Sequence, residues 1–279
     1  MITAAVVWCG IFIYRRIRAC GVGRLSLHSG HTTLISRDQY QIQNPDFVYT
    51  QPGSNLPMTT YRPKYITFDC YGTLTWFQMG NMTRELYAEH VPAERMQAFI
   101  KDFEAYRFDE VLGAWQPYES VIKNAVERTC RKWKIVYDDN VAQGFYDAVP
   151  SWGPHPDVAE PLVRVAEHYR LVILSNASDN QIQSNVDKLG APFHAVYTAE
   201  QAQAYKPRFQ AFEYMLDQLG CGPEDLLHVS ASLRYDLMPA WGLGIENKVY
   251  VNRGYEPSTP YFGYSEISDI GGLPGLVGL

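Results

Sequence analysis

The chain has 279 residues, of which 46% are hydrophobic and 19% are charged, and its formal net charge is −6. These values describe an ordinary globular protein with room for one or two domains and a sizeable core. The negative charge gives no electrostatic footprint for nucleic acid, and five cysteines without a CxxC pair argue against a disulfide framework or a zinc site. We therefore expect a reducing, cytoplasmic location and no nucleic-acid partner.

Residues 1–57 differ from the rest of the chain. The apolar run over 2–14 is too short to span a membrane, and its basic residues follow it, unlike those of a signal peptide. The polar, Gly- and Pro-containing stretch beyond it shows no sustained period. We interpret 1–57 as a disordered or loosely attached extension, expect no membrane association, and hypothesise that Met58 is the biological start.

The first clear strand covers residues 65–68, an aromatic and β-branched run typical of a buried strand. It ends at Asp69, and Gly72 then allows a sharp turn. An acid at the carboxyl end of an inner strand costs desolvation energy unless it is paired, and ligands of open α/β sheets bind at that edge. Asp69 either caps the turn or serves a site.

Residues 79–153 are predicted to be helical, with apolar positions at spacings of three and four. We expect helices over 83–90, 93–112, 118–134 and 139–149. Pro92 and Pro117 suit helix starts, and Gly113 suits a helix end. Because the links are short, these helices form a small bundle inserted directly after the Asp69 strand.

From residue 154 to 279 helices and strands alternate. We expect a helix over 158–168, one from Ser178 or Asp179 to Gly190, and one after Lys206-Pro207 that ends near Gly220. Strands are expected over 171–176, 195–198, 226–229 and 248–252. With residues 58–78 these elements form an α/β core, a Rossmann-like doubly wound parallel sheet interrupted by the helical insert.

Polar residues follow the strands of this core or stand in the loops beyond them. Each has a plain explanation alone, such as a helix cap or a solvated loop lysine, but their gathering at one sheet edge makes coincidence improbable. The candidates, in chain order, are Asp69 with Thr73, Ser175 with Asn176, Lys206 and Asp236.

The motifs FDCYGTL, VILSNAS and AYKPRFQAFEYML resemble those of the haloacid dehalogenase (HAD) superfamily, and within it the L-2-haloacid dehalogenases. The resemblance covers about residues 61–255, including the helical cap. It implies a hydrolase that cleaves the C2–halogen bond of a small 2-haloacid through an aspartyl ester, without metal or cofactor. It also makes a homodimer plausible.

The resemblance implies a role for each candidate residue. Asp69 would be the nucleophile, kept ionised by Lys206 and hydrogen-bonded by Thr73. Asp236 would position the water that cleaves the ester. The substrate would be bound by Ser175, the backbone of Asn176, Tyr71, Asp109 and Ser230.

Two positions argue against the superfamily's commoner phosphatase activity. Phosphatases carry a second Asp two residues after the nucleophile, where this chain has Tyr71, which cannot protonate a leaving alcohol at neutral pH. They also carry a Gly-Asp pair that helps to bind Mg²⁺, where this chain has Ser230-Ala231. A Mg²⁺-dependent phosphatase is the weaker alternative, and a binding protein without activity the weakest.

The resemblance also fails in places. Our alignment of the cap puts Asp109 where dehalogenases have the arginine that receives the halide, and Arg107 lies two residues earlier. Phe212 replaces an expected tyrosine, and an expected asparagine near Ser232 is absent. An acid would repel a halide but suit a protonatable leaving group. The same ester chemistry on a strained-ring acid, as in azetidine-2-carboxylate or epoxide hydrolases, is therefore the main alternative.

Overall fold

The computed structural model describes residues 61–279, so the expected extension over 1–57 and the hypothesis about Met58 lie outside the described residues. A six-stranded sheet has the order β3-β2-β1-β4-β5-β6, and all its strand pairs are parallel. The strands are β1 (Tyr65–Phe68), β2 (Arg170–Ser175), β3 (Ala195–Thr198), β4 (Leu226–Ser230), β5 (Asn247–Val251) and β6 (Ser265–Ile267). The predicted doubly wound parallel sheet is confirmed. The short strand β6 was missed because it has no apolar run.

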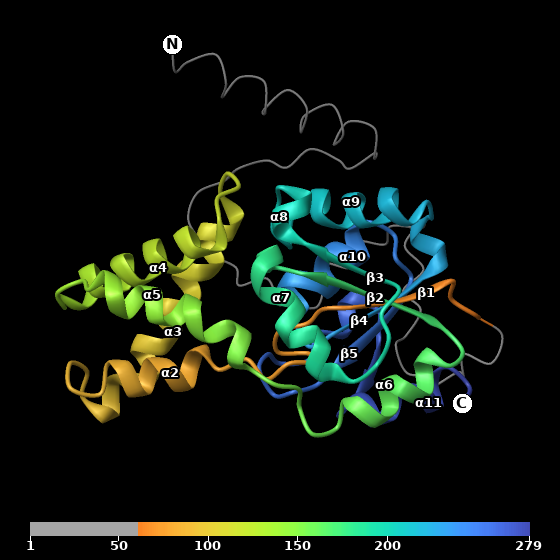
Figure 1. Cartoon of the computed structure of the whole chain (residues 1–279), viewed down its shortest axis with the longest axis horizontal. Helices are drawn as coiled ribbons and strands as arrows, with labels where there is room; N and C mark the ends of the chain where they lie inside the picture. Colours follow the sequence, from red (N-terminus) through yellow and green to blue (C-terminus); the bar gives the residue numbers. More distant parts are fainter. Residues whose placement is uncertain (1–60) are drawn as a thin grey trace, which may run out of the picture. The chain divides into compact units, whose positions relative to one another are not determined.

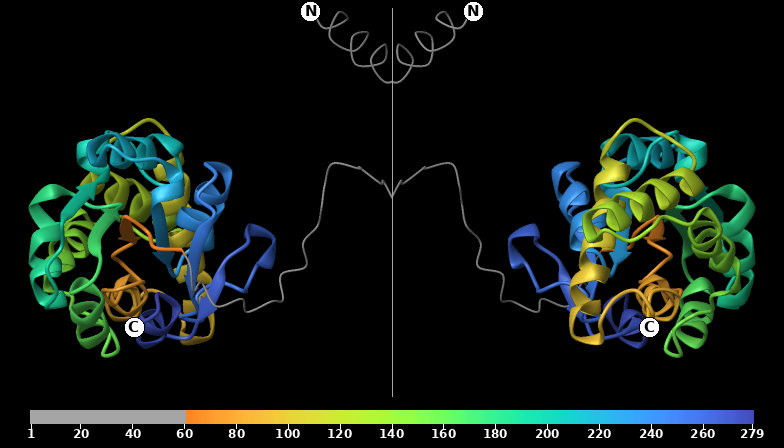
Figure 2. Two further views of the ribbon diagram at one scale, coloured as in Figure 1. Left: turned by 90° about the vertical axis from the view of Figure 1, so that its right-hand side faces the viewer. Right: turned by 90° about the vertical axis from the view of Figure 1, so that its left-hand side faces the viewer.

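Helices cover both faces of the sheet. One face packs against α6 (Ala159–Ala166), α7 (Asp179–Val186) and α11 (Leu273–Leu276), and the other against α9 (Phe209–Leu219) and α10 (Met238–Gly242). The short α8 (Ala199–Ala202) follows β3. Figures 1 and 2 show α6 beside α11 and α9 on the opposite side of the strands. The strands are therefore buried on both sides, which explains their nearly continuous apolar sequences.

The cap consists of α2 (Met79–Leu86), α3 (Ala93–Leu112), α4 (Tyr118–Trp133) and α5 (Asp139–Ala148), which lie together at one end of the core in Figure 1. They enclose a hydrophobic cluster of their own. Pro92 and Pro117 occupy the N-cap positions of α3 and α4, as expected. The first helix was expected over 83–90 and lies four residues earlier, since its buried side begins at Met79.

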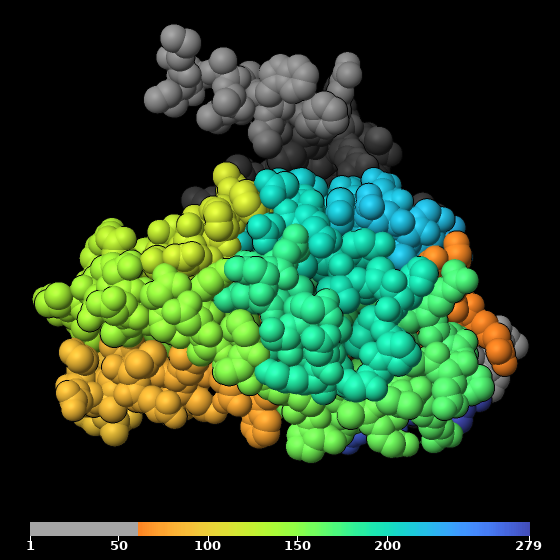
Figure 3. Space-filling view, in the orientation of Figure 1, coloured from red at the N-terminus to blue at the C-terminus, as the bar shows by residue number. Residues whose placement is uncertain are grey.

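The cap and the core touch beside the sheet edge. On the face drawn in Figure 3, atoms of the cap lie against those of the core. The hydroxyl of Tyr205 on the core donates a 2.7 Å hydrogen bond to the backbone oxygen of Gln116 on the cap. The amide of Gln181 on α7 donates to the backbone oxygen of Tyr146 on α5 at 2.7 Å. These contacts join the cap to the loop before α9 and to α7 of the core.

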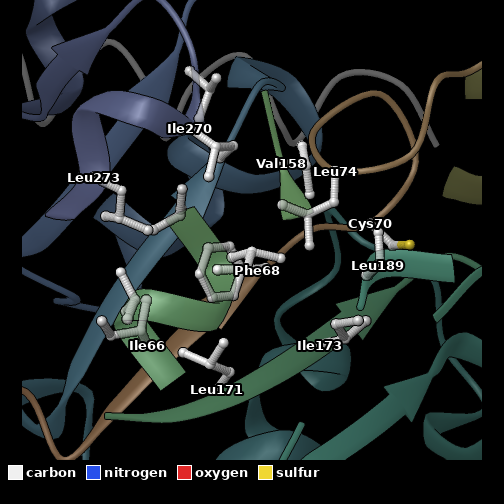
Figure 4. Packing of buried hydrophobic residues seen from close by; sticks show 14 of the residues in the cluster. Ile66, Phe68, Cys70, Leu74, Val158, Leu171, Ile173, Leu189, Ile270 and Leu273 are labelled. Atoms are coloured by element: carbon white, nitrogen blue, oxygen red, sulfur yellow. The ribbon is translucent and has the colours of Figure 1, made fainter. Parts of the chain in front are cut away.

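The centre of the core is β1, whose residues are all buried. Figure 4 shows Ile66 and Phe68 of β1 packed beside Leu171 of β2 and Leu273 of α11. Strand β1 pairs with β2 on one side and β4 on the other, and the chain order reverses there. Ligands of doubly wound sheets bind at such a point, so the fold places Asp69 where a ligand site is expected.

Candidate active site

The site begins at the carboxyl end of β1. Gly72 has a φ of 91°, a left-handed conformation that costs other residues energy, and it lets the chain turn directly after the strand. The turn brings the hydroxyl of Thr73 to Asp69, where it donates a 2.8 Å hydrogen bond to Oδ2. The same hydroxyl oxygen accepts a 2.9 Å bond from the backbone N–H of Ala231 after β4. The Thr73 hydroxyl thus links the Asp69 carboxylate to the loop after β4.

Lys206 is the centre of the charged network. Its side chain is 1% exposed, and its ammonium donates 2.8 Å hydrogen bonds to Asp69 Oδ1 and to Asp236 Oδ1. The third ammonium hydrogen goes to the backbone oxygen of Leu174 in β2, also at 2.8 Å. Every proton of the buried cation therefore has an acceptor, as a buried charge requires. The structure brings together Asp69, Thr73, Lys206 and Asp236, the four candidate catalytic residues.

The two carboxylates differ in their electrostatic environment. Burial raises the pKa of Asp69 above its ordinary value, against the attraction of the Lys206 ammonium. Burial also opposes ionisation of Asp236, but the attraction of Lys206 and a hydrogen bond from His228 hold the pKa of that carboxyl below its ordinary value. For Lys206, burial would lower the pKa, yet the two carboxylates raise it. The cation is therefore charged at neutral pH, and Asp69 is the more basic acid.

Asn176 holds the backbone of the lysine. Its amide donates a 2.9 Å bond to the backbone oxygen of Lys206, and its Oδ1 accepts a 2.7 Å bond from the backbone N–H of Lys206. We expected only the backbone of Asn176 to act, so this positioning role of the side chain was missed. An asparagine directly after a strand and a distant lysine give no sequence signal for such a pairing.

Two serines at the sheet edge differ in their partners. Ser175 is buried at the end of β2, and its hydroxyl has no hydrogen-bond partner among residues 61–279. A buried hydroxyl without a partner is costly, so it can bind a ligand's polar group at little further loss. The Ser230 hydroxyl instead accepts a 3.0 Å bond from the backbone N–H of Ser232 and shapes its own loop.

His228 also belongs to the network. Its Nε2 lies 3.0 Å from Asp236 Oδ1, and its Nδ1 lies 2.8 Å from the hydroxyl of Thr67. The Oδ2 atom of Asp236 has no hydrogen-bond partner among the residues described. One oxygen of Asp236 is thus fully occupied while the other is free to accept a proton donor.

Tyr71 lies beside the site, but its hydroxyl is engaged elsewhere. It donates a 2.8 Å hydrogen bond to Oδ1 of Asn185 on α7, and its ring packs edge-on against Trp152. Burial raises the pKa of Tyr71, which makes it a still weaker acid than an exposed tyrosine. The structure therefore leaves no proton donor at the position where a phosphatase would carry its second aspartate.

The expectation that Asp109 points towards the leaving group is wrong. Its side chain is 61% exposed and forms a 2.7 Å ion pair with Arg128 on α4. The neighbouring Glu110 pairs with the same arginine at 2.6 Å. Asp109 lies on the outer side of α3, where solvent and Arg128 stabilise its charge.

Arg107, two residues before Asp109, lies instead among aromatic rings of the cap. Its guanidinium lies 5.0 Å from the ring centre of Phe77 and 5.1 Å from that of Phe103, and its Nε is buried without a hydrogen-bond partner among residues 61–279. Burial raises the pKa of Tyr118, and the nearby Arg107 opposes that rise. The cap therefore presents a cation among aromatic rings, and the Nε–H of this cation can still donate a hydrogen bond.

A cavity lies between the cap and the core. This cavity of about 240 Å³ is lined on the cap by Trp115, Tyr118 and Tyr146, and on the core by residues that include Ser178 and Tyr205. A volume of this size admits only a small molecule.

Residues 61–279 contain no group of three or more His, Cys, Asp or Glu side chains placed to hold a metal ion. No helix in this part is long and apolar enough to cross a bilayer.

Comparison with known proteins identifies the family. Haloacetate dehalogenase H-2 of Moraxella sp. strain B is 26% identical over 195 residues, which are 67% of this chain and 85% of that protein. The (S)-2-haloacid dehalogenase of Xanthobacter autotrophicus is 26% identical over 175 residues, which are 61% of this chain and 68% of the relative.

The fold agrees with these sequence matches. The solved structure of the L-2-haloacid dehalogenase from Xanthobacter autotrophicus with chloropropionic acid covalently bound superposes with a TM-score of 0.64 at 21% identity, covering 77% of this chain and 98% of the other. Residues 63–240 match the family described as haloacid dehalogenase-like hydrolases. The chain therefore belongs to the family of haloacid dehalogenase-like hydrolases.

Proposed function

We propose that the protein hydrolyses the C2–halogen bond of a small 2-haloacid through an ester on Asp69, without a metal ion. The observation that carries this proposal is the buried Asp69–Lys206–Asp236 network, in which one ammonium holds two carboxylates at 2.8 Å. The names of the two relatives, a haloacetate dehalogenase and an (S)-2-haloacid dehalogenase, support the substrate class.

The first step is displacement at carbon. An oxygen of the Asp69 carboxylate attacks C2, the carbon–halogen bond breaks, and the halide leaves with the bonding electrons. Lys206 and Thr73 fix the orientation of the carboxylate, and the raised pKa of Asp69 makes its oxygens better nucleophiles than those of an exposed aspartate. The free hydroxyl of Ser175 and the backbone of Asn176 bind the carboxylate of the substrate.

The second step is hydrolysis of the ester. Water attacks the carbonyl carbon of the Asp69 ester, and the 2-hydroxyacid leaves as its alkoxide, which takes the proton lost by the water. Asp236 passes this proton, because its Oδ2 is free to accept a hydrogen bond from the water. Asp69 is released as the carboxylic acid and loses its remaining proton to solvent, which restores the nucleophile. The sum of both steps is haloacid plus water giving hydroxyacid, halide and one proton.

Arg107 receives the halide in this proposal. A guanidinium between two phenyl rings, with an unpaired buried N–H, suits a departing anion. The strained-ring alternative depended on an acid at this position, and Asp109 lies in an ion pair on the outer side of α3 instead. The observation that favoured a ring substrate is therefore gone.

Independence from metal follows from the chemistry of the ligands. A Mg²⁺ ion prefers several hard oxygen ligands in octahedral geometry. Here the Lys206 ammonium lies between the two carboxylates. Ala231, which stands where a phosphatase carries a magnesium-binding aspartate, offers no side-chain ligand. The residues present do not fit a magnesium site. The homodimer and the cytoplasmic location expected from the sequence stay predictions.

A single-turnover experiment in ¹⁸O-labelled water tests the proposal. With enzyme in excess over 2-chloropropionate, the label should enter the Asp69 carboxylate, and a peptide containing Asp69 should gain about 2 Da, because water attacks the ester carbonyl rather than C2. Label in the product with none in Asp69 would refute the ester mechanism. The Asp69→Asn variant is the control: it should fold and release no halide.

A further inference from the structure

A chain of hydrogen bonds leads from β1 through β4 to the free acceptor of the site. Thr67 on β1 and His228 on β4 are partners in the parallel register, so their side chains point to the same face of the sheet. The Thr67 hydroxyl lies 2.8 Å from His228 Nδ1, and His228 Nε2 lies 3.0 Å from Asp236 Oδ1. All three side chains are fully buried.

The protonation of the imidazole follows from its partners. An ionised carboxylate can only accept, so Nε2 must carry a proton and donate it to Asp236. The other ring nitrogen, Nδ1, lies 2.8 Å from the hydroxyl of Thr67, which can act as a donor or an acceptor. Both ring nitrogens therefore have a polar partner, and Thr67 fixes the orientation of the ring.

The surroundings of His228 show that packing alone does not explain it. Apart from Thr67 and Lys248, its register partners on the two neighbouring strands, the side chains packed on this face include an apolar cluster, and the ring of Phe212 lies edge-on against the imidazole with centroids 5.3 Å apart. A phenyl ring would suit these neighbours, whereas an imidazole must find partners for two polar atoms. The charged partner of the imidazole is Asp236, whose Oδ1 lies 3.0 Å from Nε2.

We propose that His228 is a positioning residue for the second half-reaction, the hydrolysis of the Asp69 ester. Together with Lys206 it occupies Oδ1 of Asp236 with two donors, which fixes the carboxylate plane and leaves Oδ2 free to accept a hydrogen bond from the attacking water. The inference rests on the proposed ester mechanism. His228 contacts neither Asp69 nor Thr73, so the first half-reaction does not depend on it.

The decisive variants differ in where they place a donor. In His228→Gln the amide nitrogen reaches about as far as Nε2 and can donate to Asp236. In His228→Asn the shorter amide matches Nδ1, keeps a partner in Thr67 and cannot reach Asp236. His228→Phe removes both contacts. Met215→Ala, a truncation in the same hydrophobic cluster without any contact to the network, controls for lost stability.

The two half-reactions can be measured separately. Each variant is mixed with 2-chloropropionate, the reaction is quenched at short times, and the intact protein is analysed by mass spectrometry. Halide release in the first turnover reports alkylation, and decay of the adduct on Asp69 reports hydrolysis. We expect His228→Asn and His228→Phe to alkylate at the wild-type rate but to hydrolyse the ester about 10- to 100-fold more slowly, so that the adduct accumulates. His228→Gln should restore most of the hydrolysis rate, and Met215→Ala should change neither rate.

Two outcomes would overturn the inference alone. One is equal slowing of alkylation and hydrolysis in His228→Asn, and the other is a His228→Gln variant as slow as His228→Phe. If His228→Phe does not fold, His228→Asn and His228→Gln still test the inference, because only the glutamine can donate a hydrogen bond to Asp236. If the wild-type protein shows no label in Asp69 after a single turnover in ¹⁸O-water, the ester mechanism fails, and the inference fails with it.

Discussion

Replacing Lys206 by methionine would remove the cation that holds the site together. Methionine has a similar length and no charge, so the change leaves Asp69 and Asp236 buried without the ammonium that lies 2.8 Å from each. The Oδ1 of Asp236 would keep its bond from His228, while Asp69 would keep only the bond from Thr73. Two buried carboxylates would then repel each other.

The structure sets the magnitude of this effect. At an effective dielectric constant of 20, each contact at 2.8 Å corresponds to about 6 kcal/mol of attraction, most of which offsets the desolvation of the three charges. Removing one partner of a buried ion pair costs about 3–5 kcal/mol, because the remaining charge loses its compensation. For a domain of this size that loss lowers the melting temperature by about 6–20 °C.

The pH dependence of this cost gives a sharper test. In the wild-type protein the pKa of Asp236 is lowered, so its contribution to stability is present above the unfolded value of 3.8 and is lost as the pH falls. In Lys206→Met burial and repulsion raise the pKa of both carboxylates, so the folded variant gains protons and stability as the pH falls. The difference in unfolding free energy between wild type and variant should therefore shrink from pH 7 to pH 5.

Urea denaturation followed by circular dichroism at both pH values measures this difference. The double variant Lys206→Met/Asp236→Asn should be less destabilised than the sum of its single variants, since it removes the repulsion as well. Lys248→Met is the matched control: Lys248 is also buried, with its pKa lowered to about 8 by burial, but its ammonium contacts only backbone oxygens. Its cost should not change between pH 5 and 7. A cost for Lys206→Met below about 1 kcal/mol, or one that is independent of pH, would refute the reasoning.

Three further predictions concern activity. Arg107→Leu should lower kcat/KM for 2-chloropropionate by about 10²–10³, because the departing halide loses its cation. Asp109→Asn should leave kcat/KM within about twofold. Equal losses for the two variants in halide-release assays would contradict the role of Arg107 as the halide-binding residue. Activity should survive dialysis against EDTA, and its loss with recovery on adding Mg²⁺ would support the phosphatase alternative. The acidic limb of kcat/KM should lie above pH 3.8, since the reaction requires ionised Asp69 and burial raises the pKa of that group; a flat profile down to pH 4 would speak against it.

The core could be predicted from the sequence because its elements carry strong local signals. Strands buried on both faces appear as continuous apolar runs, and the strand expected over 195–198 has the same bounds in the structure. The ends of helices were visible where glycine adopts a left-handed conformation, as at Gly220, with a φ of 58°. Polar residues after several strands of a parallel sheet must share one edge, so the set around Asp69 could be predicted as well.

The error at Asp109 has a simple geometric cause. Successive residues of an α-helix are about 100° apart, so a shift of two residues turns a side chain by about 200°. An alignment wrong by two positions therefore exchanges the inner and outer faces of α3. The sequence did contain a correcting signal: the buried positions Phe99 and Phe103 continue at a spacing of four to Arg107. Hydrophobic periodicity was a better guide here than the alignment.

The part played by His228 could not be predicted in the same way. Its two contacts depend on the register between β1 and β4, whose paired residues are about 160 positions apart, and on the turn that returns Asp236 to the sheet. Neither is encoded in a local pattern. A histidine in an otherwise apolar strand indicates only that some partner must exist for a buried polar ring.

The network also explains how one lysine can serve two carboxylates with different roles. Before the reaction Asp69 is the more basic of the two, which suits a nucleophile, while Asp236 stays ionised under the influence of Lys206 and His228. In the proposed mechanism the ester neutralises Asp69, and the like charge that repels Asp236 disappears. Lys206 then interacts with Asp236 alone, so the second carboxylate becomes still easier to ionise. The free Oδ2 of Asp236 is therefore available to the water when the ester forms. The first half-reaction thus favours the ionised Asp236 that the second half-reaction requires.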